Sequence, residues 1–166
     1  MTITRRRFIA ALVSSLLLFT LFLLFFMGDG FLRIGNAVPL ILLPLVLSIS
    51  FFYGDNPSII AGLFAGILLD GSSANTSCFN TLFFVVVAGV TNLLAVRFLN
   101  RNLKAAICLS VGVSFGYYFL KYLVYFAFSG VSVTTDYFLN YLIPSSVYTA
   151  VWIIPFYFLQ KKLSNY

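Results

Sequence analysis

Histidine and glutamate are absent from this sequence of 166 residues, and aspartate occurs only four times. These residue types supply most general bases and many zinc ligands, so their scarcity argues against acid–base catalysis and against a zinc site. The two cysteines, Cys78 and Cys108, are expected at opposite ends of the topology derived below, too far apart for a disulfide. No glycine-rich loop with a lysine is present to bind nucleotide phosphates. We therefore predict a protein that is not an enzyme and has no catalytic, metal or cofactor site.

Charged residues of either sign are scarce, at 8% of the chain, whereas 61% of the residues are hydrophobic and 19% are aromatic. A water-soluble domain of this length could not cover such a core with so few charges. The sequence therefore predicts an all-α membrane protein with a single integral membrane domain, residues 1–166. We expect the net charge of +6 to report orientation in the lipid bilayer, and we expect no binding to nucleic acid.

Apolar runs set the number of membrane spans, because about 20 apolar residues are needed to cross a bilayer. The predicted helices are residues 8–27, 37–53, 58–74, 79–96, 105–129 and 141–160. The second of these helices contains Pro39 and Pro44, and a turn is predicted at residues 54–57 from its Gly-Asp-Asn-Pro composition.

The first run follows Arg5, Arg6 and Arg7, which also match a twin-arginine export signal. The run is long and very hydrophobic, and it ends at Gly28 without a small-residue cleavage site. We therefore interpret it as a membrane anchor.

The third helix is the ambiguous one, because its apolar part, residues 58–69, has only twelve residues. It either crosses the membrane or folds back as a re-entrant hairpin. If it crosses, the six helices place both termini in the cytoplasm, and eight of the ten Lys and Arg residues lie on that side. A fold-back would move the basic cluster at residues 97–104 outside. The positive-inside rule therefore favours a compact bundle of six transmembrane helices.

Gly62, Gly66 and Asp70 fall at i, i+4 and i+8, so they form one stripe on the third helix. Small residues at this spacing let another helix approach closely. Asp70 is expected about 18 Å along the helix from Ser58, past the middle of the hydrocarbon layer. There it must be neutral, hydrogen-bonded or paired. The alternative is that Asp70 caps a short third helix near the outer headgroups.

Lys121 is the candidate partner of Asp70, because it lies about 24 Å along the fifth helix and its side chain is long. Alternatively, its ammonium group extends to lipid phosphates within a belt of aromatic residues. The tyrosines of that belt are Tyr117, Tyr118, Tyr122 and Tyr125.

Small residues form faces on other predicted helices, and each face is able to pack against a neighbour or a partner helix. They are Ala10, Ala11, Ser14 and Ser15 in the first helix, Gly89 and Asn92 in the fourth, and Ser110, Gly112, Ser114 and Gly116 in the fifth. Pro155 interrupts the last helix, because it leaves the carbonyl of Val151 without a hydrogen-bond donor, and it is expected to bend that helix.

The motif from Gly62 to Asp70, which closes a short third helix in a compact six-helix protein, resembles the MreD family of bacterial rod shape-determining proteins. The resemblance is best from Pro39 to Leu82. It is supported by the last helix, where Trp152 and Pro155 precede a Gln-Lys-Lys sequence. The family carries a loop glycine about where Cys78 stands here.

The resemblance implies a subunit without enzymatic activity in the cell-elongation complex of the bacterial cytoplasmic (inner) membrane. MreD-like proteins bind MreC and act alongside MreB, RodA and a class B penicillin-binding protein in peptidoglycan synthesis. The structural or partner-binding residues that we predict are Gly62, Gly66, Asp70, Lys121 and Pro155. The bundle is expected to hold the single transmembrane helix of MreC.

The same size and helix number also resemble the substrate-binding S components of energy-coupling-factor vitamin transporters, whose fold the bundle is expected to share. In that case Ala11 and Ser15 would belong to a docking face on the first helix. A ligand pocket at the outer side would be lined by Asp70, Lys121, Asp136, Tyr137, Asn140 and Tyr141. A scaffold with neither role is a third interpretation.

Overall fold

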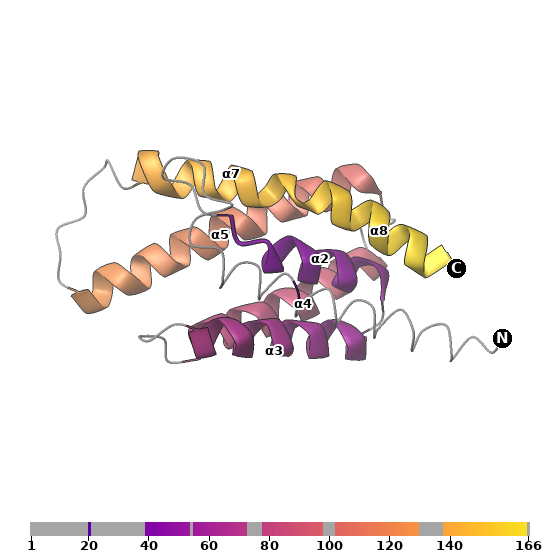
Figure 1. The fold of residues 1–166 in the computed structure, drawn as a ribbon, viewed down its shortest axis with the longest axis horizontal. Coiled ribbons are helices and arrows are strands. Elements are labelled where there is room, and N and C mark those ends of the chain that lie inside the picture. The colour runs from indigo at the N-terminus through magenta and orange to yellow at the C-terminus, as the bar shows by residue number, and fades with distance from the viewer. Residues whose placement is uncertain are drawn as a thin grey trace.

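The computed structural model describes residue 20 and residues 39–53, 55–72, 78–97, 102–129 and 138–165. Within these ranges the chain is helical apart from short turns, and it contains no strand (Figure 1). The elements are α2 (Leu42–Phe52), α3 (Asp55–Ser72), α4 (Phe79–Arg97), α5 (Leu103–Ser129), the π-helical turn η1 (Phe138–Leu142), α7 (Ile143–Val151) and α8 (Ile153–Asn165). The predicted all-α class is confirmed for this part of the chain. The predicted first helix, residues 8–27, lies outside the described residues except for Thr20.

The starts of α2 and α3 differ from the prediction, and proline accounts for both differences. The predicted turn at residues 54–57 is wrong for residues 55–57, which form the first turn of α3. A proline is tolerated in a first turn, because its missing N–H would have no partner within the helix. For the same reason Pro44 lies in the first turn of α2, which starts at Leu42 and not at residue 37 as predicted.

The last predicted helix, residues 141–160, is divided into two. α7 ends at Val151, Trp152 forms a turn, and α8 begins at Ile153. The amide of Trp152 donates to the carbonyl of Thr149 at 3.3 Å, which tightens the chain at the end of α7. The interruption predicted from Pro155 is therefore present, one turn earlier than the proline itself.

Helix α2 forms the centre of the described structure. Every residue from Leu42 to Phe51 is buried. α2 contacts α3 and α4 on one side and α8, α5 and α7 on the others, so it lies between two layers of helices (Figure 1). A helix that is apolar on all sides is suited to this position, because it has no polar face to present to solvent.

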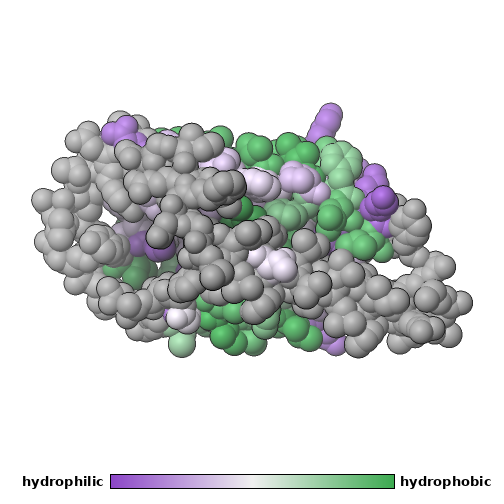
Figure 2. Space-filling model, in the orientation of Figure 1, coloured by the Kyte–Doolittle hydropathy of each residue, from purple (hydrophilic) through white to green (hydrophobic). Residues whose placement is uncertain are grey.

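The surrounding helices expose large apolar side chains. Examples are Ile60 on α3, Leu82 on α4, Val111 on α5, Val147 on α7 and Phe158 on α8. Hydrophobic side chains reach the surface above and below the middle of the molecule (Figure 2). Two helical stretches, Leu103–Val124 and Asn140–Leu163, are long and apolar enough to cross a membrane, whereas α2, α3 and α4 are shorter apolar helices.

Candidate functional site

The glycine stripe of α3 lies against α4. A Cβ atom added to Gly62 would lie 2.7 Å from the backbone oxygen of Phe84 and 3.0 Å from the Cβ of Ala88. A Cβ atom added to Gly66 would overlap the Cα of Thr81 and lie 2.9 Å from its nitrogen. α3 and α4 share the most extensive contact of any two described helices. The predicted close approach is confirmed, and the approaching helix belongs to the same chain.

Asp70 extends this contact by capping the first turn of α4. Its Oδ1 accepts a hydrogen bond from the amide of Asn80 at 3.1 Å. Its Oδ2 accepts one from the amide of Thr81 at 2.9 Å and another from the Thr81 hydroxyl. The amides of a first turn have no partner within their own helix, and a carboxylate is favoured at the positive end of the helix dipole. Asp70 therefore joins the end of α3 to the start of α4.

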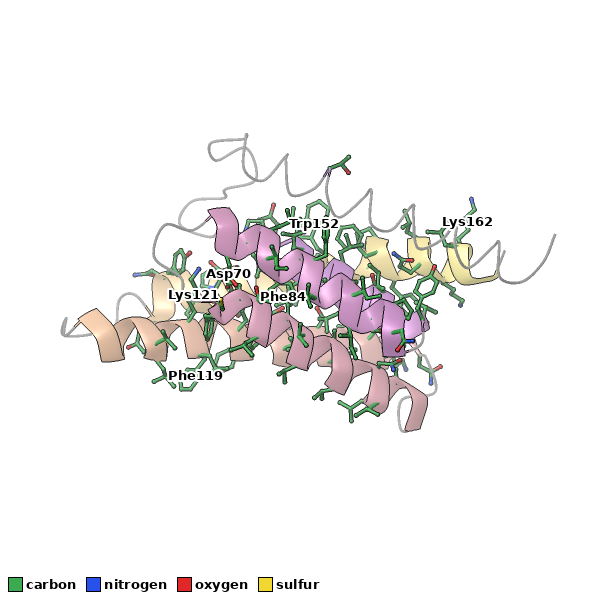
Figure 3. All side chains as sticks on the ribbon, turned by 90° about the horizontal axis from the view of Figure 1, so that it is seen from below. Asp70, Phe84, Phe119, Lys121, Trp152 and Lys162 are labelled. Carbon is green, nitrogen blue, oxygen red and sulfur yellow. The ribbon has the colours of Figure 1, made fainter. Side chains whose placement is uncertain are left out.

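The ion pair predicted between Asp70 and Lys121 is not formed. No carboxylate among the described residues pairs with Lys121, and the donors that satisfy Asp70 all come from α4. The ammonium of Lys121 lies 5.7 Å from the centre of the Tyr117 ring. The two side chains lie toward the same end of the bundle, away from Lys162 (Figure 3). The alternative placed Asp70 at the end of a short third helix, and Asp70 does lie in the last turn of α3, but its carboxylate caps α4 and not α3 itself.

The position of Asp70 along its helix also differs from the prediction. α3 begins at Asp55 and not at Ser58, so Asp70 lies about 22 Å along the helix instead of about 18 Å. This places it in the last turn of α3, nearer to the end of the helix than predicted. Its carboxylate is satisfied by hydrogen bonds, which was one of the three states expected for it.

The residue before α4 has an unusual backbone conformation. Cys78 has a φ of 51°, in the left-handed region that glycine adopts most readily. This conformation lies just before α4, two residues ahead of Asn80, whose amide donates to Asp70. The carbonyl of Cys78 then accepts from the amide of Leu82 at 3.1 Å.

Two adjacent tyrosines of α5 tie the helices together. The Tyr117 hydroxyl donates to Asn80 Oδ1 at 2.8 Å, so α5 is joined to the residue whose amide binds Asp70. The Tyr118 hydroxyl shares a hydrogen bond of 3.1 Å with Thr149 Oγ1 on α7. That oxygen also accepts from the amide of Leu40, 3.0 Å away, just before α2. These bonds link α4, α5 and α7 and the segment just before α2.

Tyr117 and Tyr118 therefore do not belong to a lipid-facing belt as predicted, since they are only 2% and 7% exposed. Phe83 and Phe84 pack around the Tyr117 ring, with ring centres 5.1 and 6.3 Å away. A sequence signal for their burial does exist. Polar residues at positions 110, 114, 117 and 118 follow the spacing i, i+4, i+7 and i+8, which marks one face of an otherwise apolar helix.

The small-residue face predicted on α5 divides into two. Ser110 and Ser114 are fully buried. Gly112 and Gly116 lie on the other side, and a Cβ added to either would meet nothing within 4 Å. Gly89 of α4 is equally open. The face predicted on the first helix lies outside the described residues.

Of the residues proposed for a ligand pocket, Asp136 and Tyr137 also lie outside the described residues. Asn140 is exposed, and the Tyr141 ring meets the edge of Tyr118 with centres 6.4 Å apart. Pro155 is exposed on α8.

Within the described ranges, no three or more cysteine or aspartate side chains gather as metal ligands would. Comparison with family models, curated proteins and solved structures finds no significant match to this chain. The function of the Asp70 site is therefore inferred from contacts within the chain.

Proposed function

We propose that this chain is a multi-pass protein of the bacterial cytoplasmic membrane, folded as a six-helix bundle like that of the S components, with both termini in the cytoplasm. The apolar exterior and the two stretches long enough to span support this proposal. The distribution of charge supports it too. Lys104 lies at the start of α5, and Lys161 and Lys162 lie in the last turns of α8, where a cytoplasmic end would carry basic residues.

Within that membrane, the chain is an MreD-like subunit of the cell-elongation complex. The observation that carries this proposal is the α3–α4 hairpin, in which each residue of the Gly62, Gly66 and Asp70 motif has a defined contact. Cys78 adds support, because its left-handed backbone is one that favours glycine, and glycine is the residue the family carries near this position.

The subunit acts by presenting helix faces, without enzymatic activity. The hydroxyls of Tyr117 and Tyr118 join helices within the bundle, and the exposed large side chains of α3, α4 and α5 are apolar. In a membrane such faces associate by close packing. Its direct partner is the single transmembrane helix of MreC, through which it supports MreB, RodA and the class B penicillin-binding protein in maintaining cell shape.

Co-purification tests this proposal. MreC from the same cells, extracted in mild detergent, is expected to be recovered with the tagged full-length chain. Depletion of the chain is expected to make rod-shaped cells wider and shorter. A Lys162→Gln variant serves as a control, because it alters an exposed residue at the end of α8 and should still recover MreC.

The proposal fails if MreC complexes are unchanged after the gene is deleted. It also fails if a vitamin raises the unfolding temperature of the purified protein while MreC is not recovered. That second result would indicate a transporter S component, since a ligand that binds the folded state stabilises it.

A further inference from the structure

Lys121 is separated from the other described lysines along the axis of the bundle. It lies about 27 Å from Leu103 along α5, close to the thickness of a hydrocarbon layer of about 30 Å. Lys104 lies in the first turn of the same helix, and Lys162 is likewise far from Lys121 in the bundle (Figure 3). In the proposed topology Lys104, Lys161 and Lys162 lie at the inner membrane boundary, and Lys121 therefore lies near the outer one.

The surroundings of Lys121 are apolar and exposed. Its neighbours on α5 are large hydrophobic residues that are exposed, namely Phe119, Leu120, Leu123 and Val124. The Lys121 side chain is exposed along part of its length, and its ammonium lies at the edge of this apolar surface, 5.7 Å from the centre of the buried Tyr117 ring. A cation in such a place is costly unless it meets a counter-charge or reaches the interface.

No described side chain supplies that counter-charge. Asp70 is bound by the amides of Asn80 and Thr81 and by the Thr81 hydroxyl. The Tyr117 ring attracts the ammonium at 5.7 Å but does not neutralise it. The ring is also fixed, because its hydroxyl is bonded to Asn80. It therefore holds one side of the ammonium and leaves its N–H donors available to another group.

We propose that Lys121 binds a phosphate anion at the outer membrane boundary, and that the headgroup of an anionic phospholipid supplies it. The acyl chains of that lipid would lie along the exposed apolar residues of α5, while the phosphate oxygens accept hydrogen bonds from the Lys121 ammonium. This inference depends on the membrane location proposed above but not on the assignment of MreC as partner.

Lipid binding to the purified full-length protein tests the proposal. Phosphatidylglycerol bound in detergent is measured by native mass spectrometry, with diacylglycerol of the same acyl chains as the uncharged probe. Lys121→Gln is expected to weaken phosphatidylglycerol binding roughly fivefold, the effect of one basic residue at an anionic surface. Lys121→Arg keeps the charge and should bind as the wild type does. Lys104→Gln, at the other end of α5, should also bind normally.

Inorganic phosphate separates the two sources of the anion. If phosphatidylglycerol raises the unfolding temperature in a Lys121-dependent way and inorganic phosphate does not, the proposal holds with lipid as the source. If inorganic phosphate alone does so, the phosphate site holds with a soluble source, and the lipid assignment is overturned.

Three results would overturn the site itself. One is unchanged phosphatidylglycerol binding by Lys121→Gln, and another is an equal loss in Lys104→Gln. The third is a stability defect of Lys121→Asp that is repaired by Asp136→Lys or Asp29→Lys, since this would identify a counter-ion in the part of the chain outside the described residues. Binding is compared only among variants whose unfolding temperature without lipid equals that of the wild type. A loss of binding then does not reflect misfolding.

Discussion

Two glycine pairs with identical spacing have opposite surroundings in this protein. Gly62 and Gly66 of α3 are pressed against the backbone of α4, where a single added carbon would collide. Gly112 and Gly116 of α5 have the same i, i+4 spacing, yet an added carbon would meet nothing. The spacing of small residues therefore indicates where a helix is able to pack closely. It does not indicate whether a neighbouring helix is present.

The comparison also distinguishes a closed side of the bundle from an open one. On the closed side, glycine contacts and the Asp70 hydrogen bonds act on the same helix pair, α3 and α4. On the open side, α5 presents apolar side chains and exposed glycine backbone. A partner helix or lipid is free to approach the open side without displacing any contact described within the chain.

The largest expected effect comes from filling the closed side. Gly66→Val should destabilise the fold by about 3 kcal/mol or more, because the added carbons meet the backbone of Thr81, which cannot move cheaply. The measurement is thermal unfolding of the purified protein in detergent. The matched variant Gly112→Val, at the exposed glycine of the α5 pair, should change stability by no more than about 0.5 kcal/mol, as is usual for exposed substitutions. Equal losses in the two variants would contradict the distinction between the sides.

Removal of the α4 cap should have the next largest effect. Asp70→Ala leaves the first amides of α4 without an acceptor and is expected to cost about 1 to 2 kcal/mol. Faster hydrogen exchange at Asn80 and Thr81 would locate the loss at the start of α4. Lys121→Gln should leave this exchange unchanged, because Asp70 is not paired with Lys121. If Lys121→Gln speeds exchange as much as Asp70→Ala, the assignment of the cap is wrong.

The hydrogen bond from α5 to the closed side should contribute less. Tyr117→Phe removes the donor to Asn80 Oδ1 and keeps the ring contacts, so a loss of about 1 kcal/mol is expected. Tyr148→Phe, on a half-buried tyrosine of α7, is the control and should be nearly neutral. Both are measured by thermal unfolding. A neutral Tyr117→Phe would show that the bond adds nothing to stability.

The smallest effect should be a gain. Cys78→Gly is expected to stabilise the protein by about 0.5 kcal/mol. Glycine adopts the left-handed conformation without the strain that cysteine has there, but it also makes the unfolded chain more flexible, which offsets part of the gain. Cys108→Gly should have the opposite sign, because glycine lowers the stability of a helix interior such as that of α5. If the unfolding temperatures of the two variants shift in the same direction, the claim that the backbone of Cys78 is strained is wrong.

Sequence alone was sufficient for much of the described fold. Long apolar runs located α3, α4 and α5 to within a few residues, because apolar length is a strong signal in a chain with so few charges. The stripe of Gly62, Gly66 and Asp70 also identified the buried side of α3, since its members share one helical face.

Sequence reasoning failed where backbone groups or equivalent apolar faces decided the structure. The partners of Asp70 include amides of α4, and an amide is present at almost every residue, so no residue type marks them. Lys121 was chosen because its charge is visible in the sequence. The central place of α2 was also unpredictable, because faces toward lipid and faces toward protein are similarly apolar.

The burial of α2 has a consequence for the order in which the chain is made. α2 is synthesised before every other described helix that contacts it, and its cover includes α8, at the far end of the chain. The centre of the bundle therefore remains incomplete until α8 has left the ribosome and docked. A nascent chain that stops before Ile153 would expose an apolar helix that is normally enclosed, and it should be a preferred substrate for membrane quality-control proteases.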